Sequence, residues 1–122
     1  MKKMPFIGAG ILLLLSSSVF ADEHLTEAVE HANDAVHHGE AGDTAIFIGH
    51  AKAALEHVLV DSIVARGVPK KHLDDAAKEL QESIELANWG HIGSATLHAE
   101  AALKHIKISN KYIEPAVKIQ KP

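Results

Sequence analysis

Histidines recur at intervals of seven residues in three segments of the chain. One segment carries His91, His98 and His105, with alanine and leucine filling half of the positions between them. The other two segments carry the series His24, His31, His38 and the pair His50, His57. Seven residues span two turns of an α-helix, so histidines with this spacing lie along one side of a helix. The repeat therefore favours long helices that pack side by side.

Apolar residues follow the helical period in four stretches, and no stretch shows the alternation of a strand. We expect helices over about 23–38, from Asp43 or Thr44 to about 65, from about Pro69 to 87, and from about His91 to a point before Pro115. Gly39 and Gly42 are expected in the first turn, and Asn88-Trp89-Gly90 in the last. The sequence predicts an all-α fold, an up-down-up-down antiparallel four-helix bundle.

The second half of the bundle repeats the first. His24-Leu25 recurs as His72-Leu73, and the segment 50–57 recurs as 98–105. Gly42 has its counterpart in Gly90. We interpret the repeat as an internal duplication of a helical hairpin.

The N-terminus has the pattern of an export signal. Lys2 and Lys3 precede an apolar run over 6–15, and Val19-Phe20-Ala21 is a small-residue cleavage site. We therefore divide the chain into a signal peptide (1–21), a histidine-rich bundle (22–110) and a C-terminal tail (111–122). The apolar run is too short for a comfortable membrane span, so we expect export to the periplasm and no membrane contact after cleavage.

Composition narrows the possible ligands. The formal charge is −4, and cleavage would remove Lys2 and Lys3, so the mature protein is more acidic and disfavours nucleic acid as a partner. The chain has no cysteine, and both methionines, Met1 and Met4, precede the cleavage site. The remaining ligand types are imidazole and carboxylate, which suit Cu(II), Zn(II) or Ni(II) and argue against Cu(I).

Nine of the ten histidines occupy the same heptad position, immediately beside the apolar core. In an antiparallel hairpin this position faces its counterpart on the partner helix. The predicted pairs are His24–His57, His31–His50, His38–Asp43, His72–His105, Glu79–His98 and Leu86–His91. The predicted metal ligands are His24, His31, His38, Asp43, His50, His57, His72, Glu79, His91, His98 and His105.

Each pair supplies at most two ligands, so water or a nearby carboxylate must complete the coordination of an ion. The candidate carboxylates are Glu27, Asp34, Asp61 and Asp75. His37 alone falls on the outer face, where a solvated role is expected. Trp89 is expected to form an apolar cap over one end of the bundle.

Three motifs resemble those of the small metal-binding protein family. They are His-Leu-x-x-Ala-Val-x-His at 24–31, His-Ala-x-x-x-Leu-x-His at 50–57 and its copy at 98–105. The resemblance implies a small exported four-helix bundle that binds copper and other divalent ions in the periplasm for buffering or scavenging. By position it implies the ligands His24, His31, His38, His50, His57, His72, His91, His98 and His105. The chain departs from the pattern at Asp43, Glu79 and Leu86.

These observations predict a non-catalytic, monomeric protein whose partners are metal ions. We expect it to bind several divalent ions, copper first, for buffering, storage or detoxification. Two alternatives stay open at this point. One is a pH-responsive structural or adaptor module, in which histidines beside the core would charge together near pH 6 and loosen the bundle. The other is a metal-dependent enzyme, although the chain lacks a Glu-x-x-His pairing and a nucleophile motif.

Overall fold

Four helices account for nearly all of the described chain. The computed structural model describes residues 17–120, and the side chains of 25–112. The helices are α2 (Ser17–Ala41), α3 (Thr44–Val64), α4 (Gly67–Asn88) and α5 (Ile92–Gln120). Helix α2 begins before the predicted cleavage site, which therefore lies within a continuous helix.

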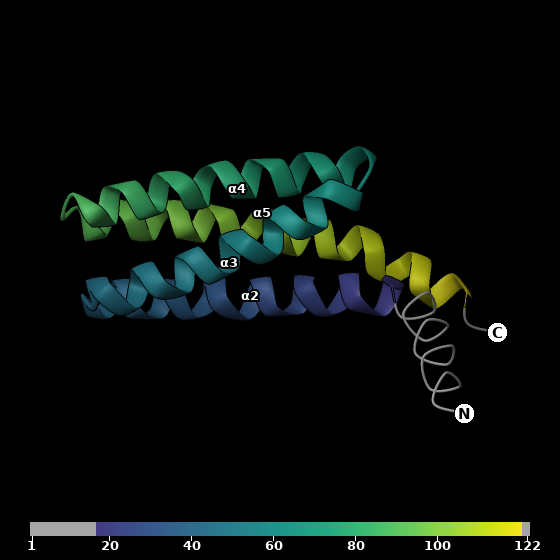
Figure 1. Cartoon of the computed structure of the whole chain (residues 1–122), viewed down its shortest axis with the longest axis horizontal. Coiled ribbons are helices and arrows are strands. Elements are labelled where there is room, and N and C mark those ends of the chain that lie inside the picture. The colour runs from purple at the N-terminus through teal and green to yellow at the C-terminus, as the bar shows by residue number, and fades with distance from the viewer. Residues whose placement is uncertain (1–16, 121–122) are drawn as a thin grey trace, which may run out of the picture.

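The helices form two antiparallel hairpins that lie side by side (Figure 1). Helix α2 packs mainly against α3, and α4 mainly against α5. The two hairpins meet where α3 contacts α4 and where α2 contacts α5. The α2–α3 and α4–α5 turns lie at the same end of the molecule (Figure 1). This arrangement confirms the predicted up-down-up-down four-helix bundle.

The two hairpin turns are closed in the same way. Gly42 and Gly90 adopt the left-handed region, with φ of 84° and 88°. The amide of Asp43 donates to the carbonyl of His38 at 2.9 Å, and the amide of His91 donates to the carbonyl of Leu86 at 2.8 Å. These are the long hydrogen bonds of a Schellman motif, which needs a residue of positive φ that glycine supplies without strain. The equivalent turns agree with an internal duplication.

Gly39 does not belong to the turn, as the sequence had suggested, but to the last part of α2. It is buried, and a Cβ atom at this position would clash with the side chain of Thr96 and lie 2.9 Å from Cδ2 of Phe47. Gly39 therefore allows α2 to approach α3 and α5 closely. A glycine in a sequence indicates either a turn or a close contact, and the position relative to the helix end decides between them.

The core is built largely from alanine. Its larger members are Leu25, Phe47, Leu73, Leu80 and Ile106, all fully buried. Alanine at the helix contacts lets the backbones approach closely, although each contact removes little apolar area from water. The buried residues recur with the helical period that the sequence predicted.

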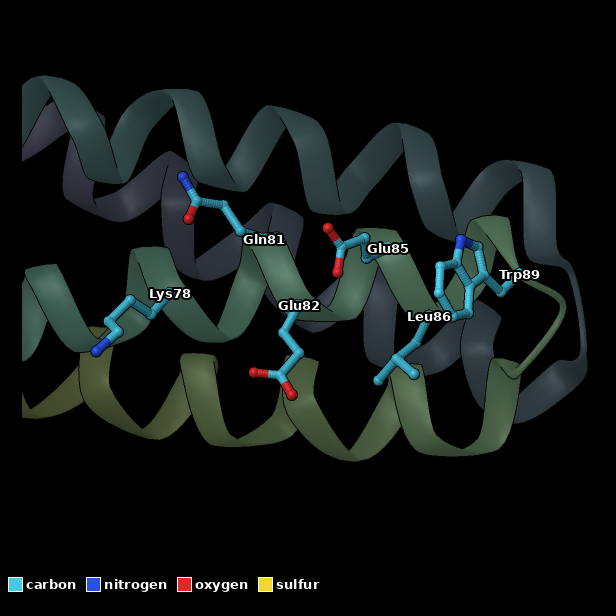
Figure 2. A pocket seen from close by; sticks show the side chains of 6 residues that line it. All are labelled: Lys78, Gln81, Glu82, Glu85, Leu86 and Trp89. Carbon is cyan, nitrogen blue, oxygen red and sulfur yellow. The ribbon is translucent and has the colours of Figure 1, made fainter.

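Trp89 does not cap the bundle. Its side chain is 76% exposed. The buried side chain near this end of the bundle is that of Phe47, in the first turn of α3. Trp89 follows the last residue of α4 and borders a surface hollow of about 360 Å³ (Figure 2). The hollow is lined by Lys78, Gln81, Glu82, Glu85, Leu86 and Trp89. A tryptophan in a turn lies outside the helical repeat, so the apolar period does not predict its direction.

The end of the last helix differs from the expectation. Helix α5 continues through Pro115 to Gln120 instead of ending before the proline. Proline removes one helical hydrogen bond and crowds the preceding turn, which disfavours a helix without preventing its continuation. Asp43 occupies the N-cap position of α3 but makes no side-chain capping bond. Its carboxylate instead faces His38.

No helix within the described part of the chain is both long and apolar enough to cross a membrane.

Candidate metal sites

Four of the predicted cross-helix pairs are in contact. His31 Nδ1 lies 3.1 Å from His50 Nδ1, and His72 Nδ1 lies 2.9 Å from His105 Nδ1. His98 Nδ1 lies 2.7 Å from a carboxylate oxygen of Glu79. His38 Nδ1 lies 3.4 Å from Asp43 Oδ2, beside the hairpin turn. The geometric pairing predicted from the heptad register is confirmed for these four pairs.

The histidines of the first hairpin also make diagonal contacts that the pairing does not include. The ring of His31 stacks on His57 at a centroid distance of 5.8 Å, and His38 stacks on His50 at 5.5 Å. Together with the 5.4 Å between His31 and His50, these contacts join four imidazoles in a zigzag. Histidines on one helix repeat about every 10.5 Å. The observed distances are about half of this repeat, so His31 and His50 contact each other and each also stacks on a second imidazole.

Carboxylates complete two clusters along this zigzag. Potential ligand atoms of Glu27, His31 and His57 lie within 4.8 Å of one another, as do those of His31, Asp34 and His50. Glu27 Oε1 is 3.1 Å from His57 Nε2, and Asp34 Oδ2 is 4.0 Å from His50 Nδ1. Each cluster offers two imidazoles and one carboxylate, a ligand set that could hold a divalent transition metal ion. His31 belongs to both clusters.

The second hairpin contains a third cluster, formed by His72, Asp75 and His105. Asp75 accepts a hydrogen bond from Lys71 Nζ at 3.1 Å. This hydrogen bond lowers the pKa of Asp75 below its ordinary value, and the charges of Lys71, His105 and His72 act in the same direction. Asp75 is therefore a carboxylate at neutral pH, with Lys71 competing for it.

His98 lies between two carboxylates. Its Nδ1 contacts Glu79, and its Nε2 lies 3.7 Å from Glu82 Oε1. Glu79 and Glu82 occupy the positions that correspond to His31 and Asp34 in the first hairpin. Because they approach opposite nitrogens of the ring, the three side chains do not surround one point, and they do not form a cluster like the other three.

The remaining candidate residues take no part in the three clusters of the described side chains. The side chain of His24 lies outside the described residues, so the pair His24–His57 is untested. His91 is exposed and belongs to none of the three clusters. His37 is exposed, as expected for the outer face. Asp61, a candidate carboxylate, is buried with 3% exposure and also lies outside the clusters.

The clusters lie at the edges of the helix seams, within reach of solvent. The side chains of His50 and His57 are 28% and 19% exposed, and those of Asp34 and Glu27 are 58% and 49% exposed. In the His31–His50 and His72–His105 contacts, one Nδ1 donates its proton to the lone pair of the other. Both lone pairs become available once the donating ring carries its proton on Nε2. The hydrogen bond therefore holds the two imidazoles close together, with their Nδ1 atoms directed at each other, and an ion can approach them from solvent.

Glu82 is a neighbour of His98 that sequence reasoning missed, because it looks like one of several solvated acidic residues on α4. The internal repeat could have identified it, since it corresponds to Asp34 in the first hairpin. It also lines the hollow beside Trp89, where none of the lining residues is a histidine (Figure 2).

Comparison with known proteins places these side chains in context. A protein-family model described as small metal-binding protein matches residues 1–109, which include all three clusters. No curated protein matches the chain.

Proposed function

Because the chain belongs to the small metal-binding protein family, we propose that it binds several divalent metal ions in the periplasm, Cu(II) foremost, for buffering, storage or detoxification. The observation that carries the proposal is the pairing of two imidazoles with one carboxylate in three clusters. Water can complete the coordination, since the clusters lie at the surface.

The ligand types support copper. The clusters offer imidazole nitrogen and carboxylate oxygen, and no sulfur. Tetragonal coordination by nitrogen and oxygen is typical of Cu(II) and Ni(II), and the Irving–Williams order favours Cu(II).

The number of clusters and their exposure support buffering over catalysis. Similar ligand sets recur on both hairpins, and the half-buried histidines leave room for exchange with solvent. An enzyme would need one site that differs from the others and encloses a substrate. The apolar N-terminal run and the small residues up to Ala21 support export and a periplasmic location.

The test is a calorimetric titration of the purified protein with Cu(II), Zn(II) and Ni(II) separately. We expect several bound ions, with Cu(II) bound most tightly. His105→Ala should lose one tightly bound ion, because it leaves the α4–α5 cluster with a single imidazole. His37→Ala removes an exposed imidazole outside the clusters and should bind as the parent does. Equal binding by the parent and His105→Ala would show that the cluster is not a site.

A further inference from the structure

His31 occupies an unusual position, because two clusters depend on it. It forms one cluster with Glu27 and His57, and the other with Asp34 and His50. The ring centroid of His31 lies 5.8 Å from that of His57 and 5.4 Å from that of His50. The imidazole is therefore placed between two ligand pairs that would otherwise be independent.

A neutral imidazole cannot complete both clusters at the same time. Of its two ring nitrogens one carries a proton, so only the other has a lone pair to donate. This limit holds whichever nitrogen of His31 is used. Once His31 serves one cluster, the other keeps one imidazole and one carboxylate, a much poorer site for a divalent ion.

We propose that the two clusters on the α2–α3 hairpin are alternative positions of a single ion, with His31 as the ligand that both positions share. The inference rests on the proposed function and deepens it. The ion changes position by exchanging His50 and Asp34 for His57 and Glu27, which lie on the two sides of His31. The zigzag of imidazoles thus gives the hairpin one mobile ion instead of two fixed ones.

The second hairpin provides the contrast. Glu79 takes the place of His31 there, and its carboxylate contacts His98. The cluster of His72, Asp75 and His105 shares no residue with another cluster among the described side chains. It therefore holds an ion of its own, in one position.

The test counts tightly bound Cu(II) by equilibrium dialysis against a competing chelator. The variants are His50→Ala, His57→Ala and the double variant, all in a His72→Ala background that disables the α4–α5 cluster. Each single variant retains one complete position, so we expect it to bind as many ions as the background protein. The double variant removes both positions and should lose one ion. His37→Ala serves as the control for loss of an exposed imidazole, and circular dichroism checks that each variant keeps its helices.

Electron paramagnetic resonance gives a second readout. With one equivalent of Cu(II), the spectrum of the background protein should be the sum of the spectra of the two single variants. Loss of one ion by each single variant and of two by the double variant would mean two independent sites, and would overturn the proposal. An exchange-coupled pair of Cu(II) ions would also overturn it, because His31 would then bridge two ions. If the double variant binds as many ions as the background protein, the α2–α3 hairpin holds no ion. The proposed function then fails for this hairpin as well.

Discussion

At the scale of single residues, the carboxylates of the three clusters differ in their neighbours. Glu27 lies 3.1 Å from His57 and Asp34 lies 4.0 Å from His50, whereas Asp75 is hydrogen-bonded to Lys71. An ion at the α4–α5 cluster therefore shares Asp75 with the ammonium group of Lys71, which holds one of its two oxygens. Lys71 acts as an internal competitor of the metal.

Replacing Lys71 should strengthen this cluster. In Lys71→Ala the pKa of Asp75 rises toward its ordinary value, but the group stays ionised at neutral pH and is free to bind. We expect the Cu(II) affinity of the α4–α5 cluster to rise about twofold, the range expected for an exposed pair four residues apart on a helix. The measurement is a chelator competition at neutral pH. It uses a His31→Ala background, because His31 belongs to both clusters on the α2–α3 hairpin.

Lys104→Ala is the matched control, since Lys104 is an exposed cation next to His105 and makes no described contact with Asp75. An equal rise in Cu(II) affinity in both variants would indicate that removing any nearby positive charge favours Cu(II), and not that Lys71 competes for Asp75.

The sequence allowed the cross-helix side-chain pairs to be predicted, but not the way in which one histidine takes part in two clusters. The seven-residue period and the antiparallel hairpin place His31 opposite His50 and His72 opposite His105. The stacking of His31 on His57 depends on the axial offset of the two helices. That offset is set by the turn geometry and by close packing at Gly39, neither of which the histidine period contains. Asp61 looked like a candidate because of its charge, but the apolar stripe around it buries it instead.

At the scale of helices, the approach of α2 to its neighbours depends on Gly39. In Gly39→Ala the added methyl group would meet Phe47 and Thr96. Overpacking of this kind costs about 1–3 kcal/mol. We expect the free energy of unfolding to fall by this amount in urea denaturation followed by circular dichroism.

Gly49→Ala provides the comparison, because Gly49 is helical and exposed, and a methyl group there would meet no atom within 4 Å. Alanine is a better helix former than glycine by about 1 kcal/mol, so this variant should be as stable as the parent or more so. If Gly39→Ala proves equally stable, the close approach of the helices at this point is not what the structure indicates.

Helix boundaries mark the limit of prediction at this scale. The apolar period identified the four helices and their buried faces, because burial repeats with every turn. It did not show that α5 continues through Pro115 or that Trp89 points to solvent. Both features lie where the chain leaves the bundle core. Apolar residues do not repeat with the helical turn there, so their spacing does not predict packing.

At the scale of the whole molecule, acid should release the metal. An imidazole must be neutral to bind, and its ordinary pKa is about 6.5, so protons displace bound ions as the pH falls. The hydrogen bond from Lys71 lowers the pKa of Asp75, so its carboxylate keeps its charge to a lower pH than an ordinary aspartate does. Its own contribution to stability is present above its ordinary pKa and is lost only as the pH falls through the lowered value.

We expect bound Cu(II) to leave between about pH 6 and 4. The measurement is the metal retained after dialysis at successive pH values, with circular dichroism recorded on the same samples. Copper that remains bound at about pH 4 would require ligands dominated by carboxylates, contrary to the three clusters.

The placement of the clusters has a mechanical consequence. Each cluster joins the two helices of one hairpin, and none joins α3 to α4 or α2 to α5. Bound ions therefore act as clamps within each hairpin and leave the seam between the hairpins held only by its packing. A metal-loaded molecule should therefore open first between the hairpins, along the α3–α4 and α2–α5 contacts. The two hairpins would stay joined through Ala65 and Arg66, each with its bound ion.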